Sequence, residues 1–151
     1  MLTTLTCALA FSLGAPVIKE PPKKEGPSLL GEWSFVEGTE GGKPVPFKAG
    51  ELVMKFEEKG VVRIQMKIFN KIEKLDASYT LDTTKAPSAI DLIPPAGENS
   101  GTVLGIYKIE KDTLIICTDE SGKLRPTEFA APPGKDDLSL MTFERVAKKD
   151  K

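Results

Sequence analysis

Acid–base chemistry in this chain would have to come from carboxylates, tyrosines and lysines, because the sequence contains no histidine. Histidine is the usual general base near neutral pH and the commonest metal ligand in proteins. A Ser-His-Asp triad, a Cys-His pair and a histidine zinc site are therefore excluded. Tyr79 and Tyr107 are the two side chains that carry a phenolic hydroxyl.

Carboxylates are frequent at the expected strand ends and turns. Two of them facing each other across a cleft could act as general acid and base, but Asp and Glu are also expected at turns for their hydrogen bonds alone. We expect this second role, holding turns or pairing with Lys or Arg, for Asp82, Asp91, Glu98, Asp119 and Glu128.

Cofactor-binding motifs are missing from the sequence. Residues 119–122 lack the spaced ligands and terminal Glu of a calcium loop. Gly41-Gly42 precedes no expected helix and so does not form a phosphate-binding loop. The sequence therefore predicts a protein that is not an enzyme and that needs no metal or other cofactor.

The two cysteines are expected to have different fates. Cys117 follows the apolar run Leu114-Ile115-Ile116, which predicts a small, buried and reduced thiol of low reactivity. Cys7 lies in an N-terminal segment that we expect to be removed, which would leave Cys117 without a disulfide partner.

Trp33 and Arg145 stand near the two ends of the expected folded domain, in Gly31-Glu32-Trp33 and Thr142-Phe143-Glu144-Arg145. If the first and last strands are neighbours, Arg145 can lie across the Trp33 ring in a cation–π contact that closes one end of a barrel. The alternatives are a ligand-stacking role for Trp33 and neutralisation of a ligand carboxylate by Arg145.

Arg125-Pro126-Thr127-Glu128-Phe129 is the most unusual segment of the chain. It combines a cation, a rigid proline, an acid and an aromatic ring within five residues. Such a segment is either a structural clamp, in which Arg125 or Glu128 is paired to the barrel, or a recognition loop at a barrel mouth.

The elements that must position these residues are short strands. Apolar and polar residues alternate in most segments between Trp33 and Val146, and the alternation is clearest at residues 62–68. Gly, Pro, Asn and Asp separate the segments, and none shows a sustained helical period. We expect eight strands, around residues 33–35, 52–56, 62–68, 75–81, 90–92, 101–109, 113–118 and 138–146. This pattern predicts an all-β fold, an eight-stranded antiparallel up-and-down barrel. The Gly31-Glu32-Trp33 of the first strand with Arg145 on the last resembles the arrangement of lipocalin-like barrels.

The N-terminal residues are predicted to lie outside the barrel. Residues 1–18 are mostly small and apolar and are expected to form a signal segment, although no Lys or Arg precedes Lys19. Residues 19–28 are rich in Pro, Lys and Glu and are expected to be a linker, followed by the barrel domain at 29–147 and a charged tail at 148–151. The sequence thus predicts an exported protein, periplasmic or extracellular, whose mature chain has no integral membrane segment.

Four stretches stand out in the sequence: Leu30–Trp33, Lys85–Leu92, Gly105–Lys108 with Thr113–Cys117, and Arg125–Phe129. Together they resemble a family of small secreted lipocalin-like domains from planctomycete bacteria. The resemblance covers about residues 29 to 146 and implies a lipocalin-like barrel and export. It implies no activity, because none is assigned to that family.

Two classes of function follow for a barrel of this kind, ahead of a third and least favoured class, an enzyme with a Tyr or carboxylate site in the barrel mouth. The first is a non-enzymatic binding module for a small apolar ligand in the barrel or for a protein partner, and the second is a structural or interaction domain with a filled core. Nucleic acid is not expected as a partner, because 21 basic and 22 acidic residues nearly cancel. A cavity of about 300 Å3 or more inside the barrel would favour a small ligand, and a filled barrel would favour the second class. The candidate ligand-binding, partner-binding or barrel-closing residues are Trp33, Tyr79, Tyr107, Arg125, Glu128, Phe129 and Arg145.

Overall fold

The computed structural model describes residues 27–97 and 101–149. The expected signal segment, most of the expected linker and Glu98 lie outside the described residues. Within the described part of the chain, no helix has the length and apolar character needed to cross a bilayer.

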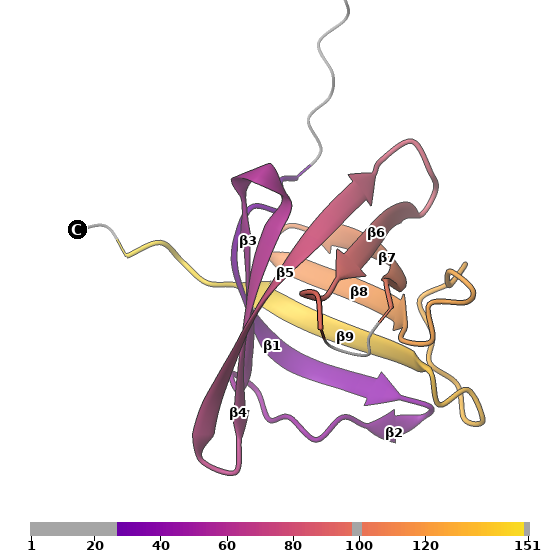
Figure 1. The fold of residues 1–151 in the computed structure, drawn as a ribbon, viewed down its shortest axis with the longest axis horizontal. Helices are drawn as coiled ribbons and strands as arrows, with labels where there is room; N and C mark the ends of the chain where they lie inside the picture. Colours follow the sequence, from indigo (N-terminus) through magenta and orange to yellow (C-terminus); the bar gives the residue numbers. More distant parts are fainter. Residues whose placement is uncertain (1–26, 98–100, 150–151) are drawn as a thin grey trace, which may run out of the picture.

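The protein is a closed antiparallel β-barrel (Figure 1). Each strand pairs with the next barrel strand in the sequence. The first also pairs with the last, so the sheet closes and neither of them is left with an unpaired edge. The eight barrel strands are β1 (Gly31–Glu40), β3 (Leu52–Glu57), β4 (Val61–Ile68), β5 (Lys71–Asp82), β6 (Ser88–Ile93), β7 (Val103–Glu110), β8 (Thr113–Asp119) and β9 (Leu138–Arg145). The predicted all-β, eight-stranded up-and-down barrel is therefore confirmed.

Short turns join most of the strands because their residues accept the backbone angles that tight turns need. A 3-10 turn, η1 (Glu58–Gly60), joins β3 to β4, and Lys59 and Gly60 have φ values of 66° and 74°. Glycine adopts such angles at no steric cost. The strand boundaries differ slightly from those predicted: β7 begins at Val103 rather than at Gly101.

Residues 39–44, which lie between the strands expected at 33–35 and 52–56, form regular structure that was not expected. β1 extends through Glu40, and a two-residue strand, β2 (Lys43–Pro44), pairs back onto it around Gly41-Gly42. Both glycines have positive φ. A bulge between Phe35 and Glu37 shifts the register of β1 on β9, which bends the strand as it follows the barrel wall.

Side chains from all eight barrel strands fill the barrel with a single hydrophobic core. Phe35 meets Phe47 and Phe143 edge to face, with ring centroids 6.3 and 5.8 Å apart. Phe56 meets Tyr79 in the same way at 5.1 Å. Phe47 is partly buried, whereas Phe35, Phe56, Phe143 and Trp33 are nearly inaccessible to solvent. Aromatic side chains therefore occupy the middle of the barrel.

A second group of buried residues lies on the outer side of the wall. Ala89, Ile106 and Cys117 are in register on β6, β7 and β8 and are buried, yet they are outside the core cluster. Alternation along each strand places them opposite the core residues. The connection from β8 to β9 contributes Ala131, which is also buried. This long connection therefore packs against the outside of the barrel.

Candidate functional site

Trp33 and Arg145 meet at one end of the barrel, where β1 pairs with β9. They are directly opposite each other in the ladder, and the Arg145 guanidinium carbon lies 4.1 Å from the centre of a Trp33 ring. Trp33 is fully buried. The contact predicted from the sequence is therefore confirmed.

The same pair holds the segment that precedes β1. The Trp33 Nε1–H donates to the carbonyl oxygen of Leu29 at 2.8 Å. Arg145 donates from Nη1 to the Leu30 carbonyl at 2.9 Å and from Nη2 to the Ser28 carbonyl at 2.7 Å. Its Nε lies 3.7 Å from Asp112 on the β7–β8 turn. All the donor nitrogens of Arg145 thus face groups of the protein.

Arg125 lies on the outside of the barrel wall, over β6 and β7. Its Nη1 donates to the carbonyl oxygens of Gly105 and Ile90, at 2.7 and 3.2 Å. Its Nη2 lies 2.6 Å from Oδ1 of Asp91 in an ion pair. This oxygen is shielded from solvent, and the contact does not have the geometry of a hydrogen bond. These contacts fix the β8–β9 connection onto two strands, as the structural-clamp interpretation requires.

The rest of this segment divides between buried and exposed positions. Pro126 is buried, Phe129 is half-buried and Glu128 is exposed. The Lys108 ammonium lies 4.9 Å from the centre of the Phe129 ring. The carbonyl oxygen of Ala130, the residue after Phe129, lies 3.5 Å from the thiol of Cys117. Glu128 is therefore the one candidate of the segment that presents its side chain to solvent.

Cys117 is fully buried and is a free thiol. Burial raises the pKa of this thiol; the Ala130 hydrogen bond opposes that shift and the nearby Glu128 charge adds to it. A neutral thiol is a poor nucleophile, so the surroundings of Cys117 favour the inert role predicted for it.

Two of the candidate carboxylates are used within turns. Asp82 accepts hydrogen bonds from the amide and hydroxyl of Thr84, which lower the pKa of the Asp82 carboxyl. Asp119 accepts from the amide and hydroxyl of Ser121 and from the Leu124 amide. Burial raises the pKa of Asp119, but these hydrogen bonds outweigh burial and leave its pKa below the usual value.

Tyr79 and Tyr107 both belong to the core inside the barrel. The Tyr79 hydroxyl donates to the carbonyl oxygen of Glu57 at 2.9 Å. Burial raises the pKa of both phenols, and the neighbouring Tyr79 adds to the rise at Tyr107. Both phenols remain protonated near neutral pH. The two tyrosines therefore pack their rings in the core and keep a polar hydroxyl at the end of the side chain.

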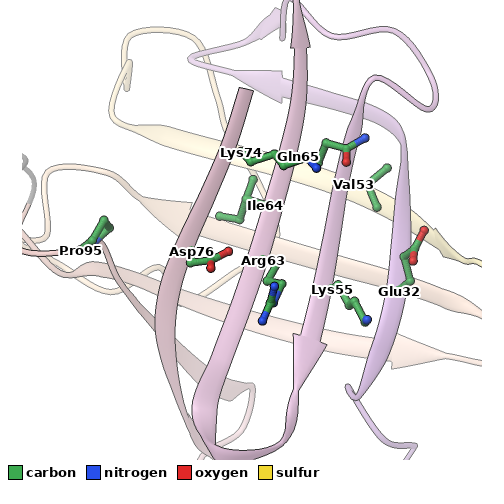
Figure 2. Close-up of a pocket in the computed structure, with 9 residues that line it drawn as sticks. All are labelled: Glu32, Val53, Lys55, Arg63, Ile64, Gln65, Lys74, Asp76 and Pro95. Carbon is green, nitrogen blue, oxygen red and sulfur yellow. The ribbon is translucent and has the colours of Figure 1, made fainter. Parts of the chain in front are cut away.

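An outward hollow of about 600 Å3 lies over β1, β3, β4 and β5 (Figure 2). Its centre is a row of four charged residues in register across these strands, in the order Glu32, Lys55, Arg63 and Asp76. Glu57 bridges the two cations, at 3.4 Å from Lys55 Nζ and 3.2 Å from Arg63 Nε. Alternation puts this row opposite the core residues of the same strands. The other lining residues are Val53, Ile64, Gln65, Lys74 and Pro95.

A second hollow of about 700 Å3 adjoins the first and shares Glu32 and Lys55 with it. It runs between the start of β1 and the C-terminal residues, where Lys148 and Lys149 line it. No motif in the sequence marks Lys55, Arg63 or Asp76 as functional residues. In the sequence, they are polar residues at every second position of a strand. That pattern shows that a face is exposed, but it does not distinguish one exposed face from another.

Asp91 and Arg125 are brought together by the fold, as are Trp33 and Arg145, but these two pairs lie on different parts of the barrel wall. Among the described residues, no three His, Cys, Asp or Glu side chains cluster in the way a metal site would need. Comparison with models of known protein families finds no match, and a search of curated proteins finds no relative. The resemblance to the planctomycete lipocalin-like family therefore stays a prediction.

Proposed function

We propose that this chain is an exported, non-enzymatic β-barrel domain that binds a protein partner on its outer surface. The observation that carries the proposal is the occupied barrel interior. Phe35, Phe56 and Phe143 are at most 2% exposed and pack edge to face with other rings. Side chains thus take up the space in which a lipocalin-like barrel would hold a small apolar ligand.

The non-enzymatic part of the proposal rests on how the candidate groups are engaged. Asp82 and Asp119 accept hydrogen bonds within turns, and Asp91 pairs with Arg125. Catalysis by carboxylates needs two of them to converge in a cleft. Export rests on the apolar N-terminal segment 1–18 of the sequence.

The hollow over β1, β3, β4 and β5 is the surface best suited to a partner. Small-molecule sites are lined mainly by apolar side chains, whereas five of the nine residues that line this hollow are charged: Glu32, Lys55, Arg63, Lys74 and Asp76. Both signs of charge are present in a fixed cross-strand order. Such an order gives register and selectivity toward a polar protein surface.

Ligand binding inside the barrel gives the first test. The purified chain is examined by native mass spectrometry and titrated with a small apolar fluorescent probe. We expect the mass of the chain alone and no saturable probe binding. Phe35→Ala is the positive control, because deleting this buried ring leaves an apolar cavity that can admit the probe. A bound small molecule in the wild-type protein would instead favour a ligand-carrying barrel.

The outer hollow gives the second test. Arg63→Glu combined with Lys74→Glu reverses two charges that line it. The control, Lys123→Glu with Lys135→Glu, makes the same net charge change at exposed positions of the β8–β9 connection. Cross-linking in the source cells should lose its partner bands in the first variant and keep them in the second. Equal capture by both variants would exclude this hollow as the binding surface.

A further inference from the structure

The hairpin that joins β4 to β5 ends in a turn with an unexpected residue. Ile68 pairs with Lys71, so Phe69 and Asn70 alone form the loop. Their φ values are 47° and 64°, which are those of a two-residue turn that needs positive φ at both positions. Asn and Gly suit such a turn, whereas a bulky residue such as Phe is rare in this conformation. An aromatic ring is thus held at the end of the hairpin against the local backbone preference.

Three large apolar side chains are exposed at this place. Phe69 is 97% exposed, Ile72 is 60% exposed and Ile68 is 38% exposed. Figure 1 shows that the β4–β5 hairpin extends beyond the neighbouring strands at the lower left of the view. We call residues 67–72 the hairpin tip. Its apolar side chains reach solvent at the end of a projection, away from the barrel core.

Lysines alternate with these apolar residues. Lys67 lies opposite Ile72 and Lys71 lies opposite Ile68, so each face of the hairpin tip carries one cation and one aliphatic side chain. Lys74 adds a third cation nearby, and Glu73 is the only acid in residues 66–74. All of these charged side chains are exposed. The hairpin tip is therefore apolar at its end and positively charged around its base.

We propose that the hairpin tip inserts Phe69 into the surface of an anionic lipid membrane. Apolar side chains at the headgroup boundary, together with lysines that contact anionic headgroups, are the features of interfacial membrane binding. A protein partner fits this composition less well, because residues 67–72 carry two cations and no acid, whereas charges of both signs favour a polar protein surface. A two-residue turn is also narrow compared with the roughly 800 Å2 that each partner buries in a standard protein complex. Lys74 also lines the outer hollow, but insertion of the hairpin tip depends on Phe69, Lys67 and Lys71, which do not line it.

The test places a fluorescent reporter at the hairpin tip of the full chain. Phe69→Trp is mixed with vesicles of phosphatidylcholine and phosphatidylglycerol, some with brominated acyl chains as quenchers. The native Trp33 is fully buried and gives a constant background. We expect a blue shift and quenching of the added tryptophan. Leu124→Trp, at a position where the leucine is 75% exposed outside the hairpin tip, is the matched control and should show neither change.

Variants of the cations and of the ring complete the test. Lys67→Glu combined with Lys71→Glu should weaken binding to anionic vesicles by about tenfold or more, and phosphatidylcholine alone should bind the wild-type tip poorly. Phe69→Ala should weaken tip-dependent binding by at least about tenfold, because burial of the ring is lost. Each variant should unfold at the wild-type denaturant concentration, since the positions are exposed.

Three results would overturn the proposal. The first is a water-like emission of Phe69→Trp at saturating lipid, and the second is equal binding of the tip to neutral and anionic vesicles. The third is a lipid-free dimer, seen by sedimentation equilibrium, that Phe69→Ala converts to a monomer. That result would assign the hairpin tip to contact between two copies of this chain.

Discussion

Replacing Arg145 by alanine should open the end of the barrel where β1 meets β9. The guanidinium stacks on Trp33 at 4.1 Å and donates to the carbonyl oxygens of Leu30 and Ser28. These carbonyls belong to the segment before β1. The side chain therefore connects β9 both to Trp33 on β1 and to that segment. We expect Arg145→Ala to destabilise the fold through this local loss of contacts.

The size of the effect follows from the exposure of each contact. The Arg145 side chain is 29% exposed, so we assign each of its two hydrogen bonds about 1 kcal/mol, less than the roughly 1.5 to 3 kcal/mol of hydrogen bonds to charged groups. The cation–π contact adds about 1 kcal/mol. The Asp112 carboxylate is 84% exposed and its ion pair contributes little. The sum is about 3 kcal/mol, which corresponds to a fall in Tm on the order of 10 °C for a domain of this size.

Urea unfolding followed by tryptophan fluorescence is the assay, because Trp33 is the only tryptophan. The probe therefore reports on the end of the barrel that the substitution changes. Arg145→Lys keeps the charge but loses the planar fork that reaches both carbonyls, so it should cost about 1 to 2 kcal/mol. The control is Arg63→Ala, whose side chain is 59% exposed and pairs with Glu57; it should cost less than about 0.5 kcal/mol.

A loss of stability in Arg145→Ala no larger than that in Arg63→Ala would contradict this role of Arg145. An Arg145→Lys variant as stable as the wild type would also contradict it, since the planar geometry would then contribute nothing. A red-shifted Trp33 emission in native Arg145→Ala, with an unchanged unfolding midpoint, would show that the arginine only shields the indole.

Three other predictions concern the outside of the barrel. Arg125→Ala should lower the free energy of unfolding by about 2 to 3 kcal/mol, and the clamp interpretation fails if Tm is unchanged while partner capture is lost. In a Cys7→Ser background, Cys117 should react with a thiol reagent at pH 8 at least about 100-fold more slowly in the native than in the urea-unfolded chain, because burial raises its pKa and covers it; equal rates would contradict this. The native pKa of Asp119 is lowered, so its contribution to stability is present above the unfolded pKa of about 3.9 and is lost as the pH falls through the lower native value. Asp119→Asn should therefore flatten the acid side of a plot of stability against pH, and an unaltered slope below about pH 4 would exclude this role.

The sequence alone determined the strands of this protein. Val62, Ile64 and Met66 alternate with Arg63, Gln65 and Lys67, and a period of two places such residues on opposite faces of a strand. The prediction worked because burial on one face imposes that period locally. It was less successful at residues 39–44, where β1 and β2 pair around Gly41-Gly42. A two-residue strand has too few residues to show a period.

The closing pair could also be predicted, because closure of an up-and-down barrel makes its first and last strands neighbours. Trp33 and Arg145 therefore had to come close once both were assigned to those strands. The hydrogen bonds of Arg145 to Ser28 and Leu30 could not be predicted. They depend on the path of a segment that has no periodic pattern.

Only the tertiary structure decided which exposed residues gather on one surface. Glu32, Lys55, Arg63 and Asp76 are far apart in the sequence and share only a polar character there. Strand register brings them into one row, and register depends on turn lengths and core packing across the whole barrel. The sequence likewise contained Arg125 and Asp91, but their pairing required the β8–β9 connection to fold back over β6 and β7. Local alternation thus determines which way a side chain points, whereas its neighbours are determined by contacts between residues distant along the chain.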